Sequence, residues 1–492
     1  MFDFMLTNLE IRALINSIVI SLGVSFLSIL LSFFLAVSLS FSRIPLKRLF
    51  SLLFLIPLLI PPYLHVFSWM HLLMFMGDYN LFGITSNLGI QILSSIPGVI
   101  FVLTLAYFPI SFFIIHQAID NIPLELIDAA TLVARPVKIL RHIIIPAVLP
   151  ATLTAAISTF IVAFITFDVP AFLGKNVFIT QIFKSFTFTG EITRALYLSS
   201  IPVLIVGSSW ALLLLFLVRN RPFFSLQSLP KDKPYSIKQS PALTMLIFLI
   251  FVVLSLFSSV LPLGVIQLKN LLYEGVPLYT ASSRGVIANT LWISIISSVF
   301  IVLFSSFIYL IIYRKRLGRI IFLSLLALPP ITFGILFIYL FNRPAFTGIY
   351  VTPIILIIAY SFRFTPLVCE LLYTYSQQIN PQYFESARLV YSPSWRKPRQ
   401  TWRILNKIAL PLYTPALFIA WMFSFWLVAT ELPITLLIQP PGFQTIITRL
   451  FIVLHYGAEE LMSPMTFALL SVSLLPILAV YLFFRLGKKY GQ

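Results

Sequence analysis

The sequence predicts an all-α polytopic membrane protein built from two copies of one unit. Of its 492 residues, 59% are hydrophobic and 10% are charged, and the mean hydropathy is +1.01. Apolar runs of about 20 residues recur along the chain, and each is long enough to cross a bilayer as a helix. Helices are expected because lipid offers no partner to an unpaired backbone N–H or C=O group. The third observation is that the first half of the chain resembles the second.

Eleven membrane spans are expected in chain order. The 33 prolines fit kinked spans, which helical membrane proteins tolerate. The expected spans cover residues 14–41, 49–72, 96–118, 146–167, 195–218, 242–262, 286–313, 320–341, 352–376, 411–430 and 464–484.

Basic residues alternate along the chain in a way that predicts its orientation. The net charge is +18, which in a soluble protein would suggest nucleic acid. In so apolar a chain we expect no nucleic-acid partner, because Lys and Arg mark cytoplasmic loops. Residues 73–95 contain neither. We expect a multi-pass protein of the cell (inner or plasma) membrane, with its N-terminus outside and its C-terminus in the cytoplasm. The basic connecting segments lie near residues 43–48, 138–141, 219–238, 314–319, 388–407 and 485–489.

The two halves align with the same order of prolines, charges and small residues. Ile15–Arg43 resembles Ala288–Arg316 at an offset of 273. Six spans separate the two starts, so the halves are expected to be parallel repeats. We expect a first domain over 1–220, a Pro-rich cytoplasmic linker over 221–241 and a second domain over 242–492 with one extra joining helix. Further pairs are Pro57 with Pro330, Pro109 with Pro366, Asp128 with Glu385, Pro146 with Pro411 and Pro150 with Pro415.

Each half contains a polar helical segment between two apolar spans. The first reads "ELIDAATLVARPVKILRHIIIPAVLP" and the second "YFESARLVYSPSW…NKIALPLYTP". Each is too short and too charged to span, so it should lie along the cytoplasmic face. A helix resting on lipid headgroups is one interpretation. The acidic, small-residue start favours a helix that docks on another protein. The two copies share an early proline (Pro123, Pro381), acids (Glu125, Asp128, Glu385) and small residues (Ala129, Ala130, Ser386, Ala387).

These segments resemble the "EAA" loop of ABC-importer permeases, in "DAATLVARPVKILRHIIIP" and "ESARLVYSPSW…IALP". Two further pieces, "FDVPAFLG" and "ELPITLLIQPPGFQTIITRLF", resemble the ferric-iron-type branch of that family. The resemblance covers nearly the whole chain. It implies two MetI-like permease repeats, in which each loop is a coupling helix that docks in a groove of an ATPase subunit. The family glycine is replaced by Ala134 in the first copy and Tyr391 in the second, and the second copy is eight residues longer.

The resemblance implies a permease that translocates a small solute delivered by an extracytoplasmic binding protein. Ferric iron is the leading substrate, and thiamine or another small cation or oxyanion is the alternative within the family. Two ATPase subunits would bind ATP and magnesium, so no cofactor is expected in this chain. An ion-gradient-driven secondary transporter and a membrane scaffold are the other function classes.

No sequence motif for chemistry is present. The chain has no G-x-x-x-x-G-K-[ST] stretch, so it is not expected to hydrolyse ATP by a P-loop. The five histidines are scattered without an H-E-x-x-H motif and there is one cysteine, so no metal site is expected.

Acids next to apolar spans are the candidate pathway residues, because burying charge in lipid is costly. Asp168 and Glu431 end equivalent spans, each two residues before a proline, Pro170 or Pro433. They could form a carboxylate ring at an outer gate. The simpler interpretation is that each acid binds backbone at a helix end. Arg363 and Glu370, seven residues apart on one helix, are expected to face other partners; we place neither among the pathway residues.

Overall fold

The computed structural model describes residues 6–42, 44–78, 85–219, 240–272, 281–313, 315–391, 403–456, 464–473 and 475. Of these, 87% are helical and none lies in a strand. Among them, eight helices are long and apolar enough to cross a membrane, and two bent helix pairs raise the number to as many as ten. The prediction of an all-α polytopic membrane protein is confirmed. The eight helical segments are Asn8–Phe41, Ile96–Asp120, Pro136–Ile165, Ile192–Leu212, Pro241–Val265, Arg284–Tyr313, Ile354–Ser376 and Asn406–Ala429.

The described helices fall into two runs along the chain. Residues 8–272 form α1 (Asn8–Phe41), α2 (Lys47–Leu53), α3 (Ile56–Leu59), α4 (Pro62–Asp78), α5 (Ser86–Leu93), α6 (Ile96–Asp120), α7 (Leu124–Val133), α8 (Pro136–Ile139), η2 (Leu140–Ile144), α9 (Ile145–Ile165), α10 (Asp168–Phe172), α11 (Phe178–Thr189), α12 (Ile192–Arg219), α13 (Pro241–Ser255), η3 (Leu256–Val260) and α14 (Leu261–Leu272). Residues 281–456 form α15 (Ala281–Ile308), η4 (Tyr309–Tyr313), α16 (Arg316–Ser324), η5 (Leu325–Ala327), α17 (Pro330–Phe341), η6 (Pro344–Phe346), α18 (Thr347–Tyr350), α19 (Ile354–Ser376), α20 (Gln382–Tyr391), η7 (Leu405–Ala409), α22 (Leu410–Ala429), α23 (Pro433–Ile438) and α24 (Ile446–Tyr456).

Two predicted spans are sharply broken instead of continuous. The pair Lys47–Leu59 and Pro62–Gly77 bends by 99°, and the pair Leu317–Ala327 and Pro330–Phe341 bends by 96°. Both breaks fall at consecutive prolines, which remove two backbone N–H donors and force the preceding residue out of the helical region. Ile60, before the first pair, is extended (φ −89°, ψ 119°).

The two breaks are alike in sequence. Pro61 and Pro62 stand at the first break, and Pro329 and Pro330 stand at the second. Pro57, which the sequence pairs with Pro330, lies one turn before the first break, inside α3, and that pairing stays a prediction. The last predicted span, 464–484, is described as a helix only over Pro464–Ser473, and its remainder lies almost wholly outside the described residues.

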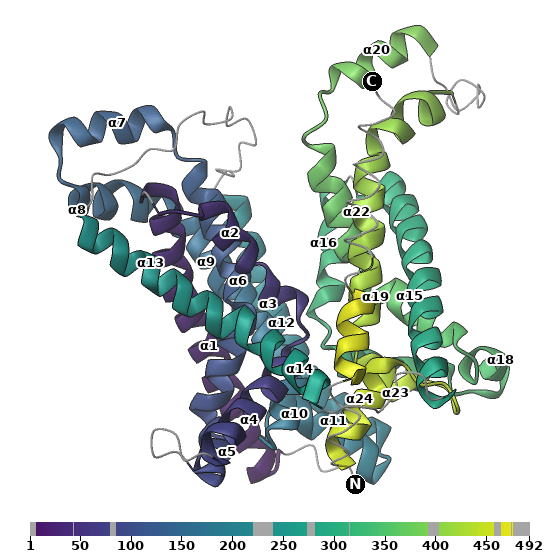
Figure 1. Ribbon diagram of the computed structural model, residues 1–492. Coiled ribbons are helices and arrows are strands. Elements are labelled where there is room, and N and C mark those ends of the chain that lie inside the picture. The colour runs from purple at the N-terminus through teal and green to yellow at the C-terminus, as the bar shows by residue number, and fades with distance from the viewer. Residues whose placement is uncertain are drawn as a thin grey trace. The chain divides into compact units, whose positions relative to one another are not determined.

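The chain divides into two compact units, Met1–Val276 with Leu328–Ile335, and Pro277–Ala327 with Leu336–Gln492. In the first, α1 packs against α6 and α9; in the second, α15 packs against α19 and α22 (Figure 1). The buried faces of α1 and α15 are rich in serine, because small residues let helix backbones approach closely. These serines are Ser17, Ser21, Ser25, Ser28 and Ser32 in α1 and Ser294, Ser297, Ser298 and Ser305 in α15.

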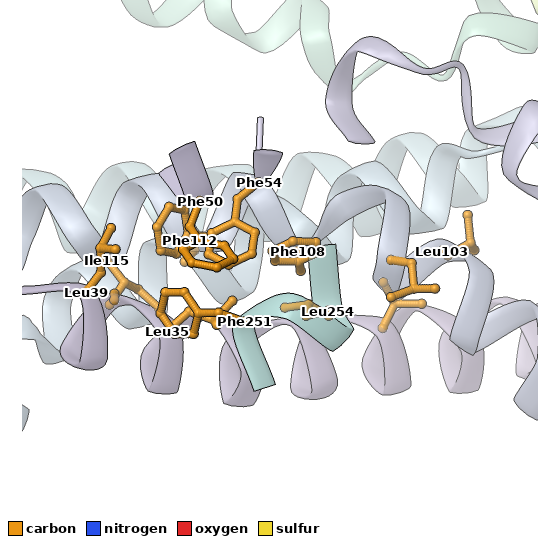
Figure 2. Close-up of a cluster of buried hydrophobic side chains, with 14 of the residues drawn as sticks. Leu35, Leu39, Phe50, Phe54, Leu103, Phe108, Phe112, Ile115, Phe251 and Leu254 are labelled. Carbon is orange, nitrogen blue, oxygen red and sulfur yellow. The ribbon is translucent and has the colours of Figure 1, made fainter. Parts of the chain in front are cut away.

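The helix that follows the predicted linker packs on the first unit. Figure 2 shows Phe251 of α13 among aromatic side chains of α2 and α6. Its ring centroid lies 5.3 Å from those of Phe50 and Phe54. Ser259 Oγ donates to the carbonyl oxygen of Leu53 at 2.7 Å. The predicted linker itself, 221–241, lies outside the described residues except for its last two.

Candidate functional site

The first polar segment is a short helix that ends earlier than its sequence pattern indicated. α7 runs from Leu124 to Val133, after Pro123 at the N-cap. Ala134 is extended (φ −136°, ψ 149°) and ends the helix. Because this φ is negative, the position does not need the conformational freedom of glycine, so alanine is accommodated here without strain.

Most of the residues singled out on α7 are accessible. Glu125, Asp128 and Ala129 are exposed, whereas Ala130 is buried against the unit. Leu132 and Val133 are 86% and 87% exposed, which is unusual for adjacent large apolar side chains.

A groove of about 640 Å³ lies between α7 and the α8–η2 segment. Its alanine-rich lining leaves room for a side chain of another surface. It is lined by Leu126, Ala129, Ala130, Val133, Ala134, Lys138, Ile139, His142 and Ile143. In Figure 1, α7 lies across one end of the first unit, while α5 and α10 lie toward the other end of that unit.

The second polar segment forms α20, Gln382–Tyr391. Asn380 Oδ1 accepts a hydrogen bond from the backbone N–H of Gln382 at 3.0 Å and so caps the start of the helix. Glu385 and Ser386 are exposed. Ala387 and Tyr391 belong to the helix, but their side chains lie outside what the structure describes.

Both polar segments lead into the next span through a π-helical turn. η2 (Leu140–Ile144) precedes α9, and η7 (Leu405–Ala409) precedes α22. Each following helix has proline at its second position, Pro146 or Pro411. Two further π-helical turns, η3 and η4, lie elsewhere in the described chain, so what the two polar segments share is the position of the turn directly before a span with an early proline.

Asp168 lies at the start of α10 and binds backbone. Its carboxylate accepts hydrogen bonds from the N–H of Val169 and from the N–H of Tyr63 at the start of α4. Burial raises the pKa of the Asp168 carboxyl to about 6, although the N–H donors act in the opposite direction. Pro170 is buried within α10. Asp168 therefore links the starts of two helices in the first unit.

Glu431 has a comparable place in the second unit but a different partner. Its Oε1 accepts from the N–H of Ile434 at 3.0 Å, at the start of α23, where Pro433 is the first residue. The buried guanidinium of Arg363 is within electrostatic reach of its carboxylate. Both acids thus make the backbone interactions of helix-end residues, and their predicted role at a gate stays a prediction.

Two ion pairs were not predicted. Glu370 accepts from Tyr313 Oη at 2.8 Å and from Arg319 Nε at 2.9 Å. Arg319 belongs to a basic connecting segment in the sequence, and in the structure its guanidinium lies beside this acid. Glu10 binds Arg194 at 2.7 Å, which joins α1 to α12. Glu370 lies within a predicted span and Glu10 lies just before the first one, and neither position in the sequence identifies the partner.

Within the described part of the chain, no group of three or more His, Cys, Asp or Glu side chains is placed to hold a metal ion. Comparisons with protein-family models, with curated proteins and with solved structures found no match. The fold alone shows a multi-pass α-helical membrane protein.

Proposed function

We propose that this chain is the transmembrane permease of an ATP-binding-cassette importer, with both permease units in one polypeptide. The observation that carries the proposal is the pair of short polar helices, α7 and α20, each beyond the end of a long apolar helix of its own unit. Each exposes an acid in its first turns, and each is followed by a π-helical turn and a proline-bearing span. These are the features expected of helices that transmit force from an ATPase.

Recurrent local geometry supports the parallel-repeat part of the proposal. Asn16 Nδ2 donates to the carbonyl oxygen of Asn176 at 3.0 Å, and Asn289 Nδ2 donates to that of Gln444 at 3.1 Å. The hydroxyl groups of Ser17 and Thr290 each accept a backbone N–H at 2.8 Å, from Phe178 and Ile446. Gly174 and Gly442, just before these contacts, have φ of +64° and +77°. Apolar helices that resemble one another only in composition are not expected to make the same polar contacts at the same places in the two halves.

In the proposed mechanism, a binding protein delivers the solute at the outer face. Closure of two ATPase subunits, which carry the ATP and magnesium, pushes on α7 and α20 and switches the units between outward and inward access. Glu125, Asp128 and Ala129 would contact one ATPase, and Glu385, Ser386 and Ala387 the other. Ala130 and Ala134 shape the docking groove from the unit side. No covalent chemistry takes place in this chain.

The proposed location is the cell membrane, with the C-terminus and both polar helices in the cytoplasm. The basic loops support this orientation. Ferric iron is the leading cargo, on the resemblance of residues 167–174 and 431–451 to the iron branch. Thiamine or another small cation or oxyanion is the alternative.

An ion-gradient-driven transporter is the second class, and the described acids favour it less. Such a transporter needs titratable acids within its spans. Glu10 and Glu370 lie in or beside spans and are each bound to an arginine. Both acids therefore make structural contacts within the chain.

Charge reversal tests the coupling role. Cells that take up radiolabelled iron through this system would carry the double variant Asp128→Lys and Glu385→Lys. Glu191→Lys, an exposed acid just before α12, is the matched control. Loss of uptake of at least tenfold in the double variant, with normal membrane levels and normal uptake in the control, is the expected result. Unchanged uptake in the double variant would refute coupling through these helices. If the purified chain brings down an ATPase but the wild type takes up no iron, the substrate assignment fails and the coupling role stands.

A further inference from the structure

A cavity of about 660 Å³ lies in the second unit, beneath the start of α20 and between α15, α19 and α22. Its size is in the range of small-molecule sites. Its described lining is Ser306, Tyr309, Leu310, Leu372, Tyr373, Ser376, Gln377, Ile379, Pro381, Phe384, Glu385, Ala409, Leu410, Tyr413 and Leu417. The lining combines apolar walls with three tyrosines and one acid.

Two of the tyrosines in the lining contact each other. Tyr309 and Tyr413 face each other from η4 and α22, with ring centroids 6.2 Å apart and hydroxyl oxygens 3.2 Å apart. At the offsets that align the two halves, the first unit has Ala36 and Val148 at these places, 0% and 1% exposed. Small residues let the equivalent helices of the first unit pack closely. The second unit has large aromatic rings at these two places, and both rings line the cavity.

The charges of the lining select the kind of ligand. Glu385 is the only acidic side chain in the described lining, which contains no Lys or Arg. Tyrosine rings attract cations through their negative faces. One of them already does so here, because the Arg319 guanidinium lies 4.3 Å from the ring centroid of Tyr373. An anionic headgroup would meet Glu385 with no compensating cation on the wall, and a bare metal ion would leave most of the volume unfilled.

We propose that this cavity binds an organic cation of the quaternary-ammonium type with an apolar body. The positive group would lie near Glu385 and the rings of Tyr309 and Tyr413, and the apolar body would lie against Leu372 and Leu417. Such a ligand would touch α20 and three long helical segments at once and so restrain α20. That regulatory consequence rests on the proposed coupling function, whereas the binding itself does not.

The binding test uses the full-length chain purified in detergent and titrated with benzyltrimethylammonium by calorimetry. Saturable one-to-one binding is expected, with no displacement by benzyl alcohol, which has the ring but no charge. Tyr413→Leu should weaken binding at least tenfold and Glu385→Gln at least threefold. Tyr383→Leu is the matched control, because this tyrosine lies on α20, is 59% exposed and is absent from the described lining; it should bind as the wild type does.

Three outcomes would overturn the proposal: no saturable binding, equal binding by wild type and Glu385→Gln, or displacement by benzyl alcohol. The last would mean an unselective apolar pocket that takes lipid or detergent. Glu385 is exposed, so its variant keeps the test valid if Tyr413→Leu fails to fold. Because this experiment measures binding, a failed uptake experiment does not refute the cavity proposal. A failed binding experiment likewise does not refute the proposed coupling function.

Discussion

Asp168 should make the protein less stable as pH rises, which is the opposite of the usual behaviour of a bound carboxylate. The carboxyl pKa rises from 3.8 to about 6 on folding, mainly through burial. The folded state therefore holds this proton more tightly than the unfolded chain does, and stability falls as pH increases through that interval. With about 1.4 kcal/mol for each pKa unit, the loss amounts to about 3 kcal/mol. The side chain keeps some solvent contact, so we expect about 2 kcal/mol.

Asp168→Asn removes this titration while keeping a side chain that can accept the N–H of Tyr63. Stability would be measured by SDS titration in mixed micelles at pH 4.5 and 7.5. The variant should exceed the wild type by about 2 kcal/mol at pH 7.5 and by much less at pH 4.5. Glu431→Gln is the contrasting control and should destabilise at pH 7.5, because it removes the carboxylate that faces the buried Arg363 charge. A destabilised Asp168→Asn at pH 7.5, or a difference that does not depend on pH, would refute the reasoning.

Two further predictions concern packing inside the first unit and use the same SDS titration. Gly98→Ala should destabilise the protein by about 2 kcal/mol, because the added Cβ would lie 2.3 Å from a backbone carbonyl oxygen of the preceding segment. Gly207→Ala is the control: its added Cβ meets open space, so this variant should be as stable as the wild type or more stable. Equal losses of stability in the two variants would contradict the packing described. Ser28→Ala should stabilise by about 1 kcal/mol because its buried hydroxyl has no hydrogen-bond partner in the described part of the chain. Ser32→Ala should destabilise the protein by about the same amount, since the Ser32 hydroxyl donates to a carbonyl oxygen of α6 at 2.9 Å. If both serine variants lose stability, the Ser28 hydroxyl does make a hydrogen bond and the prediction is wrong.

The positions of the spans could be predicted closely from the sequence, because in lipid every apolar run of sufficient length must close its hydrogen bonds as a helix. The predicted span 96–118 is observed as Ile96–Asp120, and 352–376 as Ile354–Ser376. The two bent spans were not predicted as bent. A hydropathy profile gives the length of an apolar run but not whether the helix changes direction within it. The break depends on two adjacent prolines and on the helices that pack against the part of the span after them.

The candidate site could be predicted in part. The short polar helices were expected, but α7 ends at Ala134 instead of continuing into the basic stretch that follows. The residues beside each acid in the sequence did not reveal its partner. Arg319 is 51 residues from Glu370, and Tyr63 is 105 residues from Asp168, so only the folded chain brings them together. Pairings over such distances depend on how helices pack and not on local pattern.

The most direct test of the central claim is whether an ATPase contacts α7. The chain has one cysteine, Cys369, which is buried, so a cysteine introduced at the exposed Ala129 can be labelled selectively with a thiol-reactive photo-crosslinker. In native membranes, Ala129→Cys should crosslink to a subunit that carries a P-loop, with a yield that changes when ATP is added, while Glu191→Cys should not. Crosslinking of Ala129→Cys to lipid alone, with no ATP-binding subunit captured, would contradict the account.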